Sequence, residues 1–599
     1  MPDYKSPERD IRFVLEDLLD CNQHYAQLKG ANLLDKDTRD AILSEAGKFA
    51  EQTLAPMNLS ADAEGCSFVD GKVTIPHGFK AAFDAYAEGG WAGMIADEAY
   101  GGQQLPGSIG IVVNEMLGSA NWAWTMYTGL SFGAIKCISE HGSDHQKDCY
   151  LPKLIGGKWT GTMCLTEAHC GSDVGQIKTK ALANEDGSYA ITGTKIFITG
   201  GEHDMAENIV HLVLARVDGA PEGTKGISLF LVPKYLPDAD FNPVDRNTVH
   251  CGSIEKKMGI KGSVTCVMNF DGAKGFMVGA ENSGLAQMFT MMNDARLGTA
   301  LQGLCGAESA FQGALTYAKE RLAMRALSGS KNESGPADPI IVHPDVRKML
   351  LTQKAFSEGF RAFLYEVAFT DDLAKFGVDS DQKKVALDKL NFLTPIAKAF
   401  CTELGLEAAN LGVQVFGGHG YMHDHGMEQI VRDVRISTVY EGTTGIQALD
   451  LIGRKVMGSG GELLRLYTKE IHLFCKDNEA TTSLQDFIAQ LVDYNKSWGD
   501  LTMEIGTKAQ DNVDEIGAAS VDYLMFSGYV VLAYTWAKIA KVALEKLTEN
   551  DSDKAFYDAK LITARFYFER ILPRAKAHLD SAKSGADNLM SLNADAFNF

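Results

Sequence analysis

One acidic residue, Glu441, has the surroundings that a general base requires. It lies in the stretch 439–447 (VYEGTTGIQ), where an aromatic residue precedes it and Gly442 and Thr443 follow it. A carboxylate beside apolar surface has its pKa raised, which suits proton abstraction at neutral pH. A neighbouring glycine lets a bound molecule approach the backbone closely. Taken alone, the same stretch also fits a solvated loop.

Three further stretches combine glycine with hydroxylic or polar residues. Such loops bring backbone N–H groups and hydroxyls close to a ligand. Taken singly, each also fits an ordinary capped turn or an edge strand. The three stretches are 163–173 (MCLTEAHCGSD), 195–201 (KIFITGG) and 414–421 (QVFGGHGY).

The elements that must position these stretches change type along the chain. Apolar residues recur at helical spacing from about 35 to 158, short strands alternate with turns from 159 to 280, and helical spacing returns from about 282. Gly458–Gly461 (GSGG) is the best linker, and the sequence after it again predicts helices. This order predicts a segregated α+β fold. No GxGxxG motif follows a strand, which disfavours a doubly wound nucleotide-binding fold.

We therefore expect five segments. These are an N-terminal extension (1–35), an N-terminal helical domain (36–158), a middle β domain (159–280), a helical bundle that carries Glu441 (281–457) and an additional C-terminal helical domain (461–599).

Composition limits the possible partners and compartments. Lys and Arg total 57 against 78 Asp and Glu, a net charge of −21, which disfavours nucleic-acid binding. The 11 cysteines form no CxxC pair, as expected of reduced thiols in a cytoplasmic protein. The acidic N-terminus resembles neither a secretory signal nor a transit peptide. The longest apolar stretch, 524–537, is too short to span a bilayer, so no stable membrane insertion is expected.

Taken in order, the four stretches closely resemble the acyl-CoA dehydrogenase family. The segment 257–263 (KMGIKGS), the pair Glu320-Arg321 and the RD…YEGT ending match it as well, so the resemblance covers about residues 40 to 455. It implies an N-terminal helical domain, a middle β-barrel-like domain and a C-terminal four-helix bundle. The additional N-terminal segment (Tyr4–Leu19) and the C-terminal extension indicate the subgroup of longer acyl-CoA dehydrogenases. That subgroup includes dehydrogenases of 3-(methylthio)propanoyl-CoA, which act in dimethylsulfoniopropionate catabolism, and of long-chain fatty acyl-CoA in β-oxidation.

The resemblance also implies FAD as cofactor and assigns residues to it. Phe197 stands where the family usually has Trp against the flavin ring, and Arg321 and Gln414 match residues that reach the FAD of a neighbouring subunit. A homodimer or tetramer is therefore implied. Gly445 stands where the family often has Glu or Gln. The cofactor-binding residues implied are Thr166, Ser172, Phe197, Thr199, Arg321, Gln414, Gly418 and Thr443; those implied for the substrate are Ser172, Arg296, Tyr440 and Gly442.

By the same resemblance, Glu441 is the catalytic base, which removes the α-proton of an acyl-CoA thioester while a hydride leaves the β-carbon. Some relatives carry the base just before the arginine equivalent to Arg296, but here that residue is Ala295, which cannot take a proton. Asp294, one position earlier, lies on a different helical face and is the next candidate. Arg296 either meets the substrate or is a paired structural arginine.

Several alternatives stay open at this level. The electrons pass to an electron-transfer flavoprotein in a dehydrogenase, but to O₂ in an acyl-CoA oxidase with the same base. A DNA-associated relative of the same fold would need a basic C-terminal region, whereas residues 461–599 hold about 15 Lys and Arg against about 21 Asp and Glu. His419, His423 and His425 have spacing that a metal could use, but their glycine-rich surroundings favour a cofactor loop, and we expect no metal.

Overall fold

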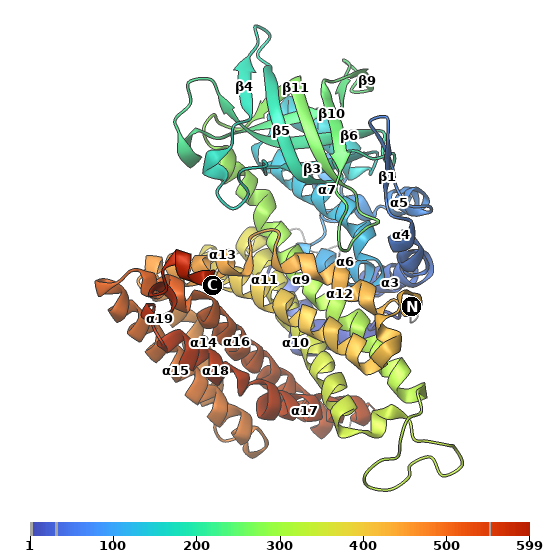
Figure 1. Ribbon diagram of the computed structural model, residues 1–599, viewed down its shortest axis with the longest axis vertical. Coiled ribbons are helices and arrows are strands. Elements are labelled where there is room, and N and C mark those ends of the chain that lie inside the picture. Colours follow the sequence, from blue (N-terminus) through green and yellow to red (C-terminus); the bar gives the residue numbers. More distant parts are fainter. Residues whose placement is uncertain (1–3, 30–33, 550–552, 599) are drawn as a thin grey trace. The chain divides into compact units, whose positions relative to one another are not determined.

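The chain forms two compact units. The computed structural model describes residues 4–29, 34–549 and 553–598. One unit runs from Leu33 to Gly298, and the other combines Met1–Asn32 with Thr299–Phe599. Helices precede the strands in chain order and follow them again (Figure 1). The predicted segregated α+β fold class is confirmed.

The helices of the unit 33–298 are amphipathic or wholly buried segments with clear boundaries. Ser143 and Gln146 form a reciprocal capping box at the start of α8, and the Asn121 side chain caps α7 directly after α6 ends. The helices are α3 (Lys36–Phe49), α4 (Asn58–Glu64), α5 (Phe79–Glu88), α6 (Gly107–Ala120), α7 (Trp122–His141), α8 (Asp144–Ile155) and the first part of α9 (Gly284–Glu320).

Seven of the described strands form one sheet, part of which closes on itself, and two further pairs form separate two-stranded sheets. In the seven-stranded sheet the order is β10-β11-β5-β4-β6-β3, and β7 pairs with both β11 and β6, so that five strands make a closed circuit. This is the barrel-like middle region that the resemblance implied. The strands are β1 (Ser67–Val69), β2 (Lys72–Thr74), β3 (Trp159–Cys164), β4 (Lys180–Ala183), β5 (Tyr189–Thr199), β6 (Asn208–Val217), β7 (Ser228–Pro233), β8 (Tyr235–Pro237), β9 (Pro243–Arg246), β10 (Val249–Ile254) and β11 (Thr265–Val278).

The second unit is helical. Its α9 and α11 approach closely where two glycines meet, because a Cβ added to Gly405 would lie 2.4 Å from the Gly303 carbonyl oxygen. Besides the end of α9, its helices are α1 (Glu8–Arg12), α2 (Cys21–Tyr25), α10 (Pro344–Phe376), α11 (Ser380–Phe416), α12 (Met427–Arg435), α13 (Thr444–Leu449), α14 (Glu462–Asp477), α15 (Gln485–Asp511), α16 (Asp514–Thr548), α17 (Lys554–Phe566), α18 (Arg574–Lys583) and α19 (Asp587–Met590).

One helix, α16, is long and apolar enough to cross a membrane by length and composition. It extends well beyond the apolar stretch 524–537 that the sequence analysis singled out. However, 72% of its most apolar window is buried inside the protein, which is typical of the core helix of a bundle. Its Trp536 indole donates to the Ala355 carbonyl on α10 at 3.2 Å, so the helix packs against the bundle.

A buried charge network joins the two ends of the chain. The Lys560 ammonium on α17 pairs with Asp10 on α1 and, at 2.9 Å, with Glu358 on α10. Arg361 of α10 also pairs with Asp10 and reaches Glu308 at 2.7 Å. Burial alone would raise the pKa of Asp10, but Lys560 and Arg361 outweigh it and lower that pKa to about 2. The N-terminal extension is thereby fixed to the C-terminal one.

Removing one cation from this network is expected to destabilise the helical unit. Lys560→Met should lower the free energy of unfolding by roughly 2–3 kcal/mol, below the usual cost of breaking a buried pair because Arg361 still faces Asp10. Denaturant unfolding at neutral pH measures the change, with Lys554→Met, an exposed position on the same helix, as the control. Because the Asp10 pKa is depressed in the folded state, its contribution is present above about pH 4 and disappears as the pH falls towards 2. Unfolding midpoints equal to those of the control at neutral pH would refute the network's role.

Candidate active site

The residues that the sequence analysis assigned to the site fall in both units. Thr166, Ser172, Phe197, Thr199 and Arg296 belong to the unit 33–298. The helical unit holds the others, which are Arg321, Gln414, Gly418, Tyr440, Glu441, Gly442 and Thr443. Each group is described in its own unit.

In the first unit, the loop after β3 lies against β5. The Ile196 N–H donates to the Thr166 carbonyl at 2.9 Å, which joins the loop to the strand that carries Phe197 and Thr199. Thr166 and Thr199 are half-buried, whereas Ser172 is exposed. The structure therefore brings Thr166, Phe197 and Thr199 together, with Ser172 farther along the same loop.

An ion pair under this loop fixes it to the sheet. The Lys195 ammonium, fully buried, donates to Glu167 Oε1 at 2.9 Å and to the Leu165 carbonyl at 3.0 Å. Glu167 also accepts from the Lys178 N–H at 2.8 Å and from the N–H and hydroxyl of Thr179. Burial alone would raise the pKa of Glu167, but Lys195 and these donors outweigh it and lower that pKa. Glu167 is thus an anchor of the loop.

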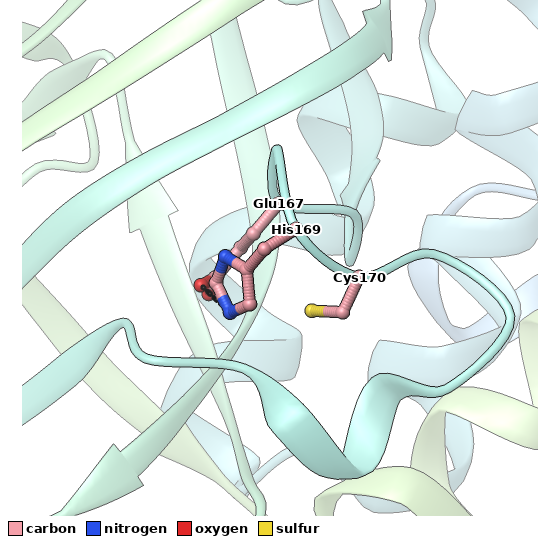
Figure 2. Close-up of side chains that lie close together, drawn as sticks. All are labelled: Glu167, His169 and Cys170. Atoms are coloured by element: carbon pink, nitrogen blue, oxygen red, sulfur yellow. Dashed lines mark ion pairs between the residues drawn. The ribbon is translucent and has the colours of Figure 1, made fainter.

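Glu167, His169 and Cys170 lie close together on this loop, as Figure 2 shows, with ligand-type atoms within 4.8 Å of one another. Their bonding does not suit a metal ion. His169 Nε2 already lies 2.9 Å from the Gln176 carbonyl, and the Glu167 carboxylate receives four donors. Burial raises the pKa of the Cys170 thiol and so disfavours the thiolate that a metal requires. We interpret the cluster as part of the loop's internal bonding.

Phe197 is held in an unusual conformation. Its φ is +60°, in the left-handed region that bulky residues rarely adopt, and its side chain is 60% exposed. The register between β5 and β11 shifts at this point, between Cys266 and Met268. Such a bulge re-aims a side chain out of the sheet and is common beside active sites. An exposed flat apolar ring, next to the Thr166 and Thr199 hydroxyls, fits one face of a flavin ring.

Arg296 lies on the part of α9 that belongs to the first unit. Its guanidinium carbon lies 5.9 Å from the centre of the Phe289 ring. The neighbouring acid, Asp294, is paired with the Lys136 ammonium of α7 at 2.5 Å. A carboxylate held by an ammonium stays ionised but is a weaker base, which favours Glu441 over Asp294.

In the helical unit, Glu441 lies on a tight turn between α12 and α13. Glu441 has φ +56° and Gly442 has φ +92°, so two consecutive residues adopt the left-handed conformation. Non-glycine residues with such a strained backbone occur mainly at functional sites, and the surrounding structure must stabilise the strained conformation. Glu441 itself is half-buried.

Three long side chains hold this turn. Gln447 Nε2 donates to the Glu441 carbonyl at 3.0 Å, and the buried Lys398 ammonium donates to the Gly442 carbonyl at 2.6 Å. The Tyr440 hydroxyl donates to Gln302 Oε1, and the Thr443 hydroxyl accepts from the Ile446 N–H to cap α13. Tyr440 and Thr443 therefore support the turn, whatever else they contact.

The sequence analysis missed three residues that support the turn, which are Lys398, Gln302 and Gln447. The one available signal was a lysine within the apolar run 395–400 (PIAKAF).

Substitution of Gly442 tests whether activity depends on the backbone conformation of this turn. A Cβ added to Gly442 would lie 2.5 Å from Gln447 Nε2, and its φ already disfavours a side chain. We expect Gly442→Ala to displace the Gln447 amide and to lower kcat by about 10- to 100-fold, since an error of about 1 Å in a catalytic group can cost that much. Gly445→Ala is the matched control, because its nearest neighbour, Thr443 Oγ1, would be 4.0 Å away. Steady-state kinetics compares the two; equal kcat values would show that the backbone of this turn tolerates displacement.

Arg321, Gln414 and Gly418 lie at one end of the helical unit. Tyr317 of α9 stacks on Phe416 of α11 with ring centres 4.0 Å apart, and its hydroxyl lies 2.8 Å from His419 Nδ1. This contact aligns the end of α9, which Arg321 follows, with the end of α11, which carries Gln414. All three predicted residues are exposed, and an exposed guanidinium beside amide and glycine N–H groups suits a phosphate group.

The histidines after α11 contact different neighbours. His419 contacts Tyr317, as above, and His423 pairs with Glu428 of α12. The His425 ring lies 4.8 Å from the His419 ring, centre to centre.

Family models match nearly the whole chain. They are the acyl-CoA dehydrogenase N-terminal domain over residues 36–158, its middle domain over 162–273, its C-terminal domain over 282–457, and an acetyl-CoA dehydrogenase C-terminal-like domain over 467–593. The chain belongs to the acyl-CoA dehydrogenase family. It is an oxidoreductase of that class and uses FAD, the cofactor of this family.

Two relatives and one solved structure resemble the chain over its whole length. The 3-methylmercaptopropionyl-CoA dehydrogenase of Ruegeria pomeroyi is 40% identical over 98% of this chain and 99% of its own. A broad-specificity linear acyl-CoA dehydrogenase of Mycobacterium tuberculosis is 33% identical over all of both chains. Caenorhabditis elegans ACDH-11, solved with C11-CoA, superposes with a TM-score of 0.77 over 99% of this chain and 96% of its own at 19% identity, which shows the shared fold.

Proposed function

We propose that this acyl-CoA dehydrogenase oxidises 3-(methylthio)propanoyl-CoA to the trans-2-enoyl thioester and passes the electrons to an electron-transfer flavoprotein. The observation that carries the substrate is the 40% identity, end to end, with a 3-methylmercaptopropionyl-CoA dehydrogenase, an enzyme named for the same acyl group. Both long relatives are named as dehydrogenases, which favours a protein acceptor over O₂. The pathway is then dimethylsulfoniopropionate catabolism.

The proposed chemistry divides between Glu441 and the cofactor. Glu441 removes a proton from the carbon beside the thioester carbonyl, and that proton stays on its carboxylate. FAD, when bound, accepts the hydride that leaves the β-carbon, so that the two carbons become doubly bonded. The residues of this chain act by position: the strained turn aims Glu441, Gln447 fixes the Glu441 carbonyl, and Lys398 fixes the Gly442 carbonyl. Closure over the acyl chain excludes water and raises the basicity of Glu441.

For the cofactor, we propose the contacts that the family resemblance implies. Phe197 packs against the flavin ring, Thr199 and Thr166 offer hydroxyls near it, and Ser172 and Thr443 bond to phosphate or substrate oxygens. Gly418 contacts the cofactor, and Arg321 and Gln414 meet the FAD of a neighbouring subunit, which makes a homodimer or tetramer part of the proposal. Arg296, Tyr440 and Gly442 line the substrate's path. We also propose a cytoplasmic location, in keeping with 11 free cysteines.

A substrate panel tests the acyl group. The proposal expects the highest kcat/KM for 3-(methylthio)propanoyl-CoA among straight-chain thioesters from C4 to C16. The 33% identity with the broad-specificity enzyme supports a second candidate, a medium- or long-chain fatty acyl-CoA substrate in β-oxidation. A maximum at a longer chain would favour that candidate.

The electron acceptor is tested separately. Turnover should depend on an electron-transfer flavoprotein or a dye, and it should proceed without oxygen. Turnover in air that produces hydrogen peroxide at the rate of enoyl-CoA formation would instead identify an acyl-CoA oxidase.

A further inference from the structure

A cationic groove lies between two helices of the C-terminal extension. It has a volume of about 460 Å³ and is lined by one face of α14 and one face of α15, which run side by side in Figure 1. The Asn495 amide of α15 donates to the Thr468 carbonyl of α14 at 3.0 Å and holds the helices together at the groove. Nothing in the proposed dehydrogenase chemistry uses this region.

The groove concentrates positive charge within an acidic region. Arg465 and Lys469 line it from α14 and Lys496 from α15, whereas no carboxylate is among its described lining residues. The extension as a whole has about 15 Lys and Arg against about 21 Asp and Glu. Arg465 is paired with Glu462 at 2.6 Å, but Lys469 and Lys496 have no ion pair within the described part of the chain. Cations gathered around one concavity repel one another unless an anion lies between them.

The floor of the groove adds no opposing charge. Val492 is apolar, and burial raises the pKa of the Cys475 thiol to about 11, so the thiol is neutral at physiological pH. Asn495 also lines the groove, and its amide is held by the bond to Thr468.

We propose that this groove is a second ligand site, separate from the dehydrogenase centre, that binds a small organic phosphate. The phosphate lies between Lys469 and Lys496, and its apolar part covers Val492. A phosphate ester carries a charge of about −1.5 to −2 at pH 7, which matches several converging cations. A carboxylate has one charge, so it matches two lysines less well.

Calorimetric titration of the FAD-loaded enzyme with phenyl phosphate at low ionic strength tests this site. We expect saturable binding that weakens at least tenfold in the double variant Lys469→Gln/Lys496→Gln. The matched control is Lys476→Gln/Lys576→Gln, which removes two exposed lysines of the same extension outside the groove and should bind as the wild type does. Both double variants should retain dehydrogenase turnover, because none of the four lysines belongs to the catalytic turn.

Three results would overturn the proposal. The first is absence of saturable phenyl phosphate binding by the wild type. The second is equal affinity in the two double variants, which would place the bound phosphate elsewhere on the enzyme. The third is equal affinity for phenylacetate and phenyl phosphate in the wild type, which would make the groove a site for any aromatic anion. Because turnover is measured separately, none of these outcomes depends on the proposed substrate.

Discussion

Glu441→Gln is expected to lower kcat by about 10³- to 10⁴-fold while the enzyme keeps its FAD. Glutamine has nearly the same shape as glutamate but cannot accept a proton, and loss of a positioned base costs this much in proton-transfer reactions. The turn itself should survive, because the bonds from Gln447 and Lys398 go to backbone carbonyls and not to the Glu441 side chain. Steady-state turnover with an artificial acceptor and the flavin content of the purified protein are the measurements.

Two controls make the Glu441 result specific. Asp294→Asn removes the next candidate base, which is already paired with Lys136, and should leave kcat within about tenfold of wild type. Glu545→Gln changes an exposed glutamate on α16 and should have no effect on turnover. If Asp294→Asn were the inactive variant and Glu441→Gln the active one, the assignment of the base would be reversed.

Lys195→Met is expected to destabilise the unit 33–298 by about 3–5 kcal/mol and to lower its FAD content. The methionine fills a similar volume but leaves the buried Glu167 carboxylate without its counter-ion. An uncompensated buried charge destabilises a protein far more than removal of both charges does. The loop that carries Thr166 would lose the anchor that fixes it to β5, so the cofactor would meet a less ordered site. Denaturant unfolding and the ratio of bound FAD to protein measure the two effects.

The matched variants for Lys195 separate charge from packing. Lys180→Met, on the adjacent strand β4 but exposed, should change neither quantity measurably. The double variant Lys195→Met/Glu167→Gln removes both charges and should recover part of the lost stability. If Lys195→Met alone were as stable as wild type and fully loaded with FAD, the pair would have no role in holding the cofactor loop.

Much of the fold could be predicted because it follows from local patterns. The change from helical spacing to short strands near residue 159 and back to helical spacing near 282 predicted the order of helices and strands that the structure has. The glycines at 458–461 predicted a break, and α14 begins directly after them at Glu462. These features depend on residues close together in the chain.

The supporting interactions could not be predicted, because they join residues far apart in sequence. Lys398 bonds to Gly442 from another helix, and Asp10 meets Lys560 from the opposite end of the chain. The positive φ of Phe197 depends on a register shift against β11, some 70 residues later, and nothing in the stretch 195–201 indicates it. Motif reasoning proposes the reacting residues, whereas the groups that hold the turn and the loop are seen only in the tertiary packing.

Proton exchange at the substrate's α-carbon tests the central claim most directly. A CoA thioester that has α-hydrogens but a fully substituted β-carbon can lose a proton yet cannot transfer a hydride. Incubated with the wild-type holoenzyme in D₂O, it should gain deuterium at the α-carbon far faster than in buffer, as mass spectrometry would detect. With Glu441→Gln the exchange should fall to the rate in buffer; exchange at the wild-type rate in that variant would contradict the account.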